Sequence, residues 1–497
     1  MPVDTKDVQG LLRFGYGSMK EAGYLVLRIR DVAAARAWCA VAPVATAEYQ
    51  ERPPEVALQV AFTWTGLGAL GLEPGLLAEF PAEFQSGMAG EEGRSRRLGD
   101  IGASAPDKWE WGQPGREPHA LVMLFARSGR LADWRQRVEN DPFLTAFETI
   151  AFLFSGDLDG HEPFGFKDGI SQPEIDWRRE RATGCDELTY TNVQALGEFV
   201  LGYPNEYGKY TDRPLLDPAA RGARGLLPAE DNPGKRDLGR NGTYLVLRQL
   251  EQDVRGFWQF LDKVSESNEA ERLRLAEAMV GRTTEGHPLM PPNTNAIRGI
   301  DDASGGPSNR FTYDGDPKGI RCPLGSHIRR SNPRNADLPG GPGSLLSRGL
   351  RMLGLCDDSY RGDLIASTRF HRILRRGREY GPRLPVADAV REDPGDTQKR
   401  GLQFVCLNAN ISRQFEFVQN AWLMSTKFDG LSEESDPLMG NRTAAGDGRD
   451  SANFSLPMEG KPPRVIAGLP QFVTMRGGAY FFLPSLRALR YFGEGPV

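Results

Sequence analysis

Two short stretches of this chain carry the same pattern of apolar positions. Residues 23–28 read GYLVLR and residues 243–248 read TYLVLR, and each run leads into a polar, helix-compatible stretch. A tryptophan, Trp38 or Trp258, follows the tyrosine of each run at the same distance. An apolar, β-rich run followed by helical periodicity predicts a strand and then a helix. The repeat therefore predicts two similar strand-helix units in two similar domains.

Each half continues with a second apolar run and a second helix-compatible stretch. Residues 57–64 lead into residues 66–70, and residues 402–407 lead into residues 412–422. A further apolar run at 120–125 predicts another strand in the first half. Such strands and helices, with antiparallel pairing, predict an α+β sandwich whose helices cover one face of each sheet. Periodicity alone does not distinguish this sandwich from other α+β arrangements.

Long irregular stretches rich in glycine and proline interrupt the pattern at residues 204–240, 290–314 and 430–463. Loops of this length are usually functional lids, insertions or disordered segments. The pattern leaves two interpretations open for each of them. They either frame a substrate channel or cofactor entrance, or they are plain surface excursions.

Composition and charge narrow the classes of protein that fit. The chain has 497 residues, which is enough for two domains, and its 39% hydrophobic and 26% charged content is typical of a soluble globular protein. A net charge of −5 gives no basic field, so neither nucleic acid nor an anionic membrane is an expected partner.

The cysteines and the N-terminus predict a cytoplasmic location. The five cysteines are odd in number, widely scattered and without a Cys-x-x-Cys spacing. The first residues lack the features of a signal peptide, and no later segment approaches the length of a membrane span. A reducing compartment fits these observations best.

Residues 165–169, GFKDG, hold an acidic side chain on a loop between two glycines. Gly165 and Gly169 allow positive φ angles and the close approach of a flat ligand, so the backbone sets the direction of the Asp168 carboxylate. A carboxylate fixed in this way suits proton transfer. By itself, the run is more typical of an ordinary Asp-Gly turn.

Two later runs change the interpretation of that turn. Residues 323–334 read PLGSHIRRSNPR, and residues 369–381 read RFHRILRRGREYG. In this order, the three runs resemble those of the dye-decolorising haem peroxidases. The resemblance covers most of the chain, from DVQG at residues 7–10 to GGAYFFLPSL at residues 477–486.

The resemblance implies a fold and a division into domains. It implies the ferredoxin-like α+β fold twice over, in the duplicated dimeric α+β barrel arrangement with long loop insertions. We expect an N-terminal domain at residues 1–200, which includes the loop of Asp168, and a C-terminal haem-binding domain at residues 241–497. Residues 201–240 form an irregular connection between them.

The resemblance also implies roles for three residues. Asp168 lies above the haem, His327 ligates the iron from below, and Arg375 completes the distal site. Some bacterial members carry an asparagine two places after that arginine. This chain has Gly377 there, so assistance from a distal amide is in doubt.

His327 is the best placed of the five histidines to bind haem iron, which needs a neutral imidazole as axial ligand. It follows Gly325 and Ser326, whose small side chains let a flat macrocycle approach. The other four histidines lack that setting: His119, His161, His287 and His371. The motif match therefore makes His327 the expected metal ligand of a haem b cofactor.

Other residues are expected to surround the cofactor. Arg329 and Arg282 are candidates for binding the haem propionates, because guanidinium groups bind carboxylates in a bidentate manner. For Arg282, a surface salt bridge is an equal alternative. An axial histidine commonly donates its second ring proton to a carboxylate, and Glu416 is one candidate for that partner.

The expected chemistry is the activation of hydrogen peroxide. A distal residue must take a proton and return it, and a cation must stabilise the separating charge. Asp168 suits the first task and Arg375 the second, and an arginine beside an aspartate favours its ionised form. The predicted enzyme uses hydrogen peroxide to oxidise bulky aromatic donors, such as dyes and phenolics, through a ferryl intermediate.

Two other classes of protein remain as alternatives. The first is a haem-binding or haem-handling protein with incidental peroxidase activity, but such a carrier needs no distal acid and cation. The second is a non-haem α+β enzyme, which requires the three motifs to be coincidental. The sequence leaves open the natural donor, the oligomeric state, and which of its tryptophans and tyrosines passes electrons to the surface.

Overall fold

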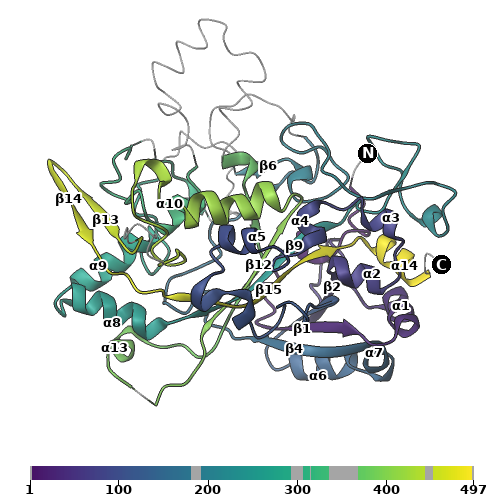
Figure 1. The fold of residues 1–497 in the computed structure, drawn as a ribbon, viewed down its shortest axis with the longest axis horizontal. Helices are drawn as coiled ribbons and strands as arrows, with labels where there is room; N and C mark the ends of the chain where they lie inside the picture. The colour runs from purple at the N-terminus through teal and green to yellow at the C-terminus, as the bar shows by residue number, and fades with distance from the viewer. Residues whose placement is uncertain are drawn as a thin grey trace, which may run out of the picture.

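A computed structural model describes residues 3–180, 192–292, 306–313, 315–334, 368–393, 395–442 and 451–494. Its centre is a nine-stranded sheet in the order β10-β12-β9-β15-β2-β3-β1-β4, and β11 also pairs with β12 (Figure 1). The strands are β1 Glu21–Ile29, β2 Val56–Phe62, β3 Ala120–Ala126, β4 Phe147–Ser155, β9 Thr243–Gln252, β10 Leu374–Arg375, β11 Arg378–Tyr380, β12 Gly401–Asn408 and β15 Val473–Leu483.

Helices and short strand pairs surround this sheet. The helices are α1 Val32–Val41, α2 Trp64–Ala69, α3 Pro74–Leu77, α4 Ala82–Ser86, α5 Glu92–Leu98, α6 Leu131–Val138, α7 Asp141–Ala146, α8 Val254–Val264, α9 Glu269–Val280, α10 His327–Ser331, α13 Val386–Ala389 and α14 Leu486–Glu494. The small strands are β5 Glu174–Ile175, β6 Val193–Gln194, β7 Leu215–Leu216, β8 Arg236–Asp237, β13 Phe454–Met458 and β14 Lys461–Ile466.

The two halves of the sheet have the same topology. The first half has the order β2-β3-β1-β4, and the second has β10 and β11, then β12, β9 and β15, with every pair antiparallel. This order, with helices between the strands, is that of a ferredoxin-like unit. The predicted α+β class with two ferredoxin-like units is therefore confirmed. The boundaries at residues 1–200 and 241–497 stay a prediction.

The predicted strand-helix repeat is confirmed, but the match of its tryptophans is not. In both units a strand, β1 or β9, leads into a helix, α1 or α8, that is capped by an aspartate at its N-terminus. Trp38 is the seventh residue of α1, whereas Trp258 is the fifth residue of α8. The register differs because β9 continues further past Tyr244 than β1 does past Tyr24, so that α8 begins ten residues after its tyrosine and α1 begins eight residues after its own. Both tryptophans are nevertheless buried.

The second predicted strands of the two halves occupy different places in the sheet. β2 is the outer strand of the first unit and meets β15, whereas β12 is an inner strand between β9 and the short strands β10 and β11. The counterpart of β2 is therefore the pair β10 and β11. Apolar periodicity records that a strand is buried, but it does not record which neighbours the strand has.

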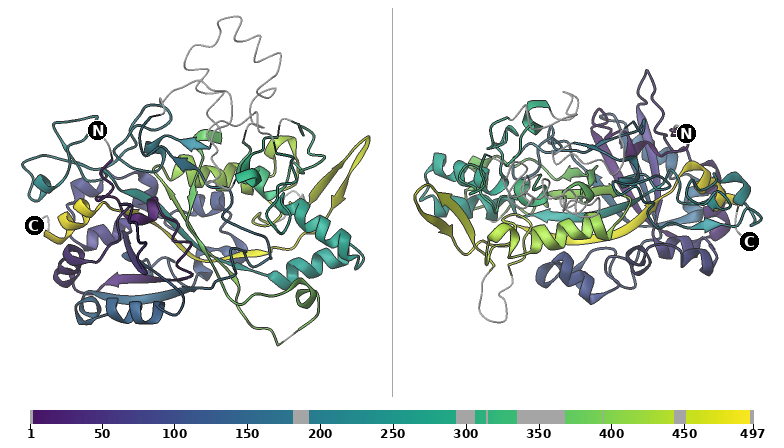
Figure 2. Two further views of the ribbon diagram at one scale, coloured as in Figure 1. Left: turned by 180° about the vertical axis from the view of Figure 1, so that it is seen from behind. Right: turned by 90° about the horizontal axis from the view of Figure 1, so that it is seen from above.

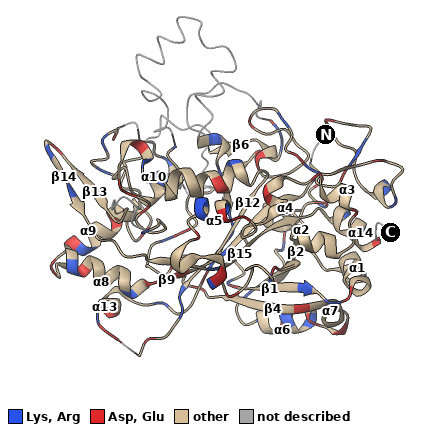
Figure 3. Ribbon diagram, viewed as in Figure 1, with Lys and Arg blue, Asp and Glu red and all other residues tan. Residues whose placement is uncertain are grey.

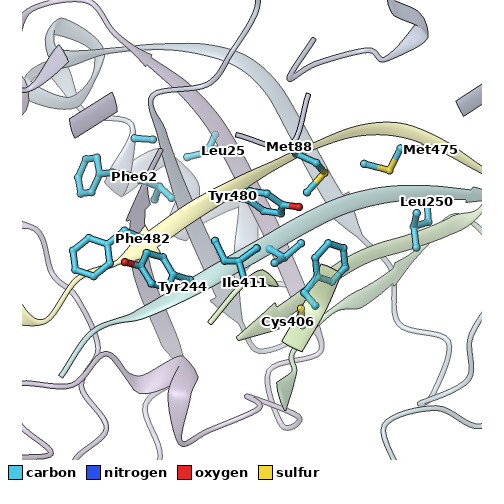
Figure 4. Close-up of a cluster of buried hydrophobic side chains, with 14 of the residues drawn as sticks. Leu25, Phe62, Met88, Tyr244, Leu250, Cys406, Ile411, Met475, Tyr480 and Phe482 are labelled. Atoms are coloured by element: carbon cyan, nitrogen blue, oxygen red, sulfur yellow. The ribbon is translucent and has the colours of Figure 1, made fainter. Parts of the chain in front are cut away.

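Both faces of the sheet are buried, which explains the nearly continuous apolar runs. Along β1, Leu25 and Leu27 join one large core cluster, and Tyr24 and Val26 join a second cluster on the opposite face. Figure 4 shows part of the first cluster, where β9, β12 and β15 contribute side chains such as Tyr244 and Tyr480. Helices cover this face, so every second residue of a strand packs against them.

The sheet curls back on itself and joins the two units at both ends. At one junction, Phe482 of β15 pairs with Phe62 of β2. At the other, Gly156 directly after β4 donates its backbone N–H to the carbonyl of Glu379 in β11, at 2.8 Å. The side chain of Glu379 also accepts the N–H of Leu158 at 3.0 Å. The view from behind shows strands of both units converging in the middle of the molecule (Figure 2).

Positively and negatively charged residues are interspersed along the ribbon (Figure 3), in keeping with the small net charge. In the part of the chain that the structure describes, no helix is long and apolar enough to cross a membrane. Cys39, Cys322 and Cys406 are buried free thiols. Cys185 and Cys356 lie outside the described residues, and the cytoplasmic location stays a prediction.

A buried ion pair links the two units close to their shared sheet. Arg248 of β9 donates to both carboxylate oxygens of Asp100, at 2.5 and 3.1 Å. The two side chains are only 3% and 1% exposed. A buried ion pair is costly to break, because the remaining charge stays in a medium of low dielectric constant.

We expect Asp100→Ala to lower the free energy of unfolding by roughly 3 to 5 kcal/mol, because it leaves the Arg248 guanidinium buried without its carboxylate. Urea denaturation followed by circular dichroism measures the change. Glu92→Ala is the control, because Glu92 forms only an exposed ion pair with Arg96 on α5. A loss in Asp100→Ala no larger than in the control would contradict the prediction.

Candidate active site

The loop after β4 presents Asp168 in a geometry that its glycines make possible. Gly165 and Gly169 have φ angles of 102° and 78°, a region that residues with a side chain rarely adopt. The backbone N–H of Asp168 donates to the carbonyl of Gly160 at 2.9 Å. The N–H of Lys167 donates to the carbonyl of Thr284 at 3.0 Å, which fixes the loop to the segment after α9.

Asp168 and Arg375 form an ion pair across a long interval of sequence. Nη1 of Arg375 lies 2.8 Å from Oδ1 of Asp168, and the residues are 207 positions apart. Arg375 is held in β10, where its backbone pairs with Cys406 of β12 and its N–H donates to the side chain of Gln172. The prediction that these two side chains share one site therefore agrees with their geometry.

The electrostatic setting of Asp168 favours its carboxylate form. Burial by itself raises the pKa of Asp168, but the charge of Arg375, the backbone N–H of Gly169 and the Arg375 hydrogen bond together lower it below its ordinary value. The side chain is 41% exposed, yet it faces an internal cavity rather than the outer surface. Asp168 is therefore ionised over the whole neutral range.

His327 is oriented by a buried carboxylate. It begins the short helix α10, and its Nδ1 lies 2.9 Å from Oδ2 of Asp436. The other carboxylate oxygen of Asp436 accepts the backbone N–H groups of Leu438 and Met439 at 3.0 and 2.8 Å. Because Nδ1 donates to Asp436, neutral His327 keeps the lone pair of Nε2 for a ligand.

Burial alone lowers the pKa of His327, but the charge and the hydrogen bond of Asp436 outweigh burial, and the pKa is raised. The pKa of Asp436 is lowered, because His327 and the N–H of Met439 stabilise its carboxylate against the opposing effect of burial. Asp168 and Arg375 also act on the pKa of His327. The two pairs therefore belong to one electrostatic site.

The sequence analysis named Glu416 as one candidate partner for His327, and that prediction is wrong. Glu416 lies in the π-helical segment Ser412–Glu416, where its carboxylate contacts Nε of Arg94 at 2.8 Å and the Tyr480 hydroxyl at 2.9 Å. Asp436, the actual partner, lies in the irregular stretch at residues 430–463. No local pattern distinguishes it from the other acidic residues of that stretch.

Arg329 does not line the cavity that His327 faces. Its guanidinium donates to the backbone carbonyls of Asp316 and Cys322 at 3.0 to 3.1 Å and lies 4.5 Å from the centre of the Tyr313 ring. The side chain is 1% exposed. Arg329 therefore stabilises the segment before α10, and it does not point toward a ligand beside His327.

Arg282 does line the cavity, and its surface salt-bridge alternative is wrong. Its guanidinium donates to the backbone carbonyls of Gly286 and Ser308, both at 2.8 Å. Burial, together with the positive charge of Arg334, lowers the pKa of Arg282 to about 10. An anion at this position would relieve that unfavourable setting.

Gly169 and Gly377 border a smaller second cavity next to the distal pair. A side chain at Gly169 would be strained by its φ angle, although the space beside it is open. At Gly377 a Cβ atom would lie 2.6 Å from the carbonyl oxygen of Gln403. The backbone therefore leaves no room at that position for the asparagine of some bacterial members.

Three further residues of the cavity wall belong to the sequence runs around His327 and Arg375: Arg334, His371 and Arg372. The His371 ring stacks on Phe417, with ring centres 3.5 Å apart, and its Nδ1 hydrogen-bonds the carbonyl of Arg413. Burial lowers the pKa of His371 to about 4, so this ring is neutral. The runs contained these residues, but spacing alone did not single them out.

The cavity has the size and chemistry of a site for a large anionic ligand. It encloses about 1590 Å³ of space without protein atoms, including the part open to solvent. The charged groups described above share its wall with apolar side chains such as Phe164, Phe166, Ile328, Ile373, Phe404 and Val418. An apolar wall with a few convergent polar groups is typical of cofactor sites.

Several known proteins are similar to this chain over most of its length. No family model matches the chain. A dye-decolorizing peroxidase of Exidia glandulosa is 28% identical over 517 residues, covering 98% of this chain and 86% of the relative. A multifunctional dye peroxidase of an Amycolatopsis species is also 28% identical, covering 87% of this chain and 81% of the relative.

Solved structures show the same fold. A fungal DyP-type peroxidase from Auricularia auricula-judae aligns over the whole of both chains with a TM-score of 0.72 and 24% identity. A DyP-type peroxidase of Anabaena aligns with a TM-score of 0.69 over 98% of this chain and 94% of the other. The fold is thus the one seen in DyP-type peroxidases. The chain is similar to dye-decolorising peroxidases over nearly its whole length, in agreement with the resemblance seen in its motifs.

We expect Asp436→Asn to lower the pKa of His327, because burial then acts without the opposing negative charge. NMR titration of labelled histidine in the cofactor-free protein measures it. The control is Asp429→Asn, since Asp429 lies near Arg329 and not near the imidazole. An unchanged pKa of His327 in Asp436→Asn would show that this carboxylate does not control the ring.

Proposed function

We propose that the protein is a haem b peroxidase that uses hydrogen peroxide to oxidise bulky aromatic donors. The observation that carries this proposal is the Asp168–Arg375 ion pair in the same cavity as His327, whose Nδ1 is bound to Asp436. A protein that only binds porphyrin needs a ligand for iron, but it has no use for a buried acid and cation beside the ligand. The names of the relatives support the same activity.

The residues of the cavity fit haem. His327 would ligate the iron through Nε2, and Asp436 would hold the imidazole in the required tautomer. Arg282, Arg334 and Arg372 would bind the propionates, while Gly169 lets the distal loop approach a flat ring. When bound, the haem iron would supply the redox centre that peroxide oxidises. Arg329 has no place in this proposal because it does not line the cavity.

The chain's own residues handle the proton of the peroxide. Asp168 is ionised at neutral pH, so it can accept the proton from the inner oxygen and return it to the outer oxygen, which then leaves as water. Arg375 carries a fixed positive charge 2.8 Å from Asp168, at the place where oxygen–oxygen cleavage develops negative charge. The aromatic donor then supplies electrons.

Both units contribute to the proposed site. We infer that residues 1–200 supply the distal loop and residues 241–497 supply His327, Arg375 and Asp436. In this division neither unit is complete by itself, because its acid and its cation come from different units. A haem carrier with incidental turnover remains the second candidate, and the distal ion pair is the feature that argues against it.

We expect His327→Ala to lose haem or to hold it weakly, because the axial bond to iron is gone. Reconstitution with haem, followed through the Soret absorption band, measures the occupancy. His161→Ala is the matched control, since His161 lies on the loop before Asp168 and is absent from the cavity wall. Full occupancy with an unchanged spectrum in His327→Ala would exclude this ligand.

Substitutions of the two distal residues should slow the reaction with peroxide by different amounts. We expect Arg375→Leu to slow the reaction of the haem-loaded protein with peroxide by about 100 to 1000-fold through loss of a preorganised charge. Asp168→Asn should slow it by roughly 100 to 10,000-fold through loss of the proton acceptor. Both variants should still bind haem, since neither residue ligates iron.

The pH dependence separates the two variants further. Because the pKa of Asp168 is lowered, the parent protein should lose activity only as the pH falls through that low pKa, where the carboxylate takes up a proton. This acid limb should be absent in Asp168→Asn. Stopped-flow absorption after mixing with peroxide, across pH, measures both effects. If both variants react with peroxide at the rate of the parent protein, the haem-carrier alternative is favoured.

A further inference from the structure

Glu162 is a buried carboxylate that neither the sequence motifs nor the proposed proton transfer uses. Its Oε1 accepts the N–H of Phe166 at 2.9 Å, and its Oε2 accepts the N–H of Phe164 at 3.0 Å. The side-chain amide of Gln252, in β9, donates to Oε2 at 2.8 Å. Both backbone groups of Glu162 also bond within this turn, to Phe166 and Gly165. The residue therefore fastens the loop that ends at Asp168 to the central sheet.

The position of Glu162 places it at the junction of the two cavities. It lines the large cavity and the smaller one, as do Asp168 and Arg375. The titratable groups that line these two cavities with Glu162 come from its own loop, from the central sheet and from the segments around His327 and Arg375: Lys167, Asp168, Arg248, Arg282, His327, Arg334, His371, Arg372, Arg375, Arg378 and Glu379. None of the ion pairs among the described residues includes Glu162.

Burial raises the pKa of Glu162 to about 7, although the N–H groups of Phe166 and Phe164 and the amide of Gln252 oppose the rise. The negative charge of Asp168 adds to the rise. Oε1 accepts a single hydrogen bond while Oε2 accepts two, so Oε1 is the oxygen that can hold a proton without breaking the turn.

We propose that Glu162 is a positioning residue of the distal site, which fixes the Asp168 loop against β9 and controls, through its own charge, the proton affinity of Asp168. The second part rests on the proposed function, because it assigns Asp168 the role of proton acceptor. Glu162 does not touch the peroxide in this proposal. It acts only through the loop and through its charge.

The direction of the effect follows from the repulsion of like charges. Below neutral pH, Glu162 is protonated, and Asp168 is influenced mainly by Arg375. Above neutral pH, Glu162 is charged, which makes protonation of Asp168 more favourable and Asp168 a stronger base. The distal site is thereby adjusted within the physiological range, where Asp168 alone does not titrate.

The first experiment follows the carboxyl group itself in the cofactor-free protein. Infrared spectra across pH record the C=O band of protonated carboxyl groups, and the wild-type minus Glu162→Gln difference isolates Glu162. This subtraction matters because burial also raises the pKa of Glu198 to about 7. We expect a difference band that disappears with a midpoint of about 7. A midpoint at the ordinary glutamate pKa would overturn the proposal.

Two further variants keep this test decisive. Glu379→Gln is the matched control, because Glu379 lines the smaller cavity and its side chain accepts one backbone N–H. The Glu379→Gln protein should retain the infrared band of protonated Glu162. Gln252→Leu removes a hydrogen bond that favours the charged form, so the Glu162 midpoint should move upward. A midpoint unmoved by Gln252→Leu would contradict the contact with β9, even if Glu162→Gln fails to fold.

Amide hydrogen exchange tests the positioning role separately. Exchange in residues 163–168 should become faster in Glu162→Gln, because an amide side chain offers only one acceptor oxygen to the N–H groups of Phe164 and Phe166. In Glu379→Gln, exchange in this segment should stay at the wild-type rate. Unchanged exchange in Glu162→Gln would remove the positioning role.

The last experiment uses the haem-loaded protein and stopped-flow mixing with peroxide. Loss of the positioning role should slow Glu162→Gln at every pH, and loss of the charge should lower its rate relative to the wild type by up to about tenfold more between about pH 6 and about pH 8, since one pKa unit in a base corresponds to at most tenfold. A rate relative to the wild type that is the same at all pH values would overturn the tuning role. Absence of any peroxide reaction in the wild type would overturn the proposed function, whereas the infrared titration still decides the state of Glu162.

Discussion

The hydrogen bond between Gly156 and Glu379 is the contact on which the site depends. It joins the end of β4 in the first unit to β11 in the second, so the curled sheet meets itself there. β10 and β11 pair with the same strand, β12, and the position of Glu379 therefore also sets that of Arg375. The chain that leaves Gly156 leads directly into the loop of Asp168. Closure of the sheet thus brings the distal acid and cation together.

The cavity concentrates charge in an apolar surrounding, and the fold offsets that cost by pairing. Asp168 with Arg375 and His327 with Asp436 are both within 3 Å, and each pair connects segments far apart in the chain. Buried charges need such partners because solvation by water is lost. Part of the energetic cost of burying charge remains at Arg282, because burial lowers the pKa of its guanidinium to about 10. An anionic cofactor at this wall would reduce that cost.

The motifs predicted the residues of the site better than they predicted the contacts of those residues. Asp168, His327 and Arg375 lie around one cavity, as expected from their sequence runs. Arg329, two residues after His327, instead turns toward backbone carbonyls, because α10 directs neighbouring side chains to different sides. Asp436 and Glu162 were missed, since the contact of Asp436 with His327 and that of Glu162 with Gln252 form only in the folded chain.

By itself, the sequence determined five strands of the central sheet (β1, β2, β3, β9 and β12), the first helix of each unit, the duplicated α+β class and the glycine-bordered loop of Asp168. These features depend on apolar periodicity and on backbone freedom over a few residues, and a short stretch of sequence is enough to determine them. Only the tertiary structure decided the place of β2 and β12 in the sheet, the choice of Asp436 over Glu416, and the burial of Glu162. Each of these depends on which distant segments exclude water from a given side chain, and burial and pairing of that kind have no local signature.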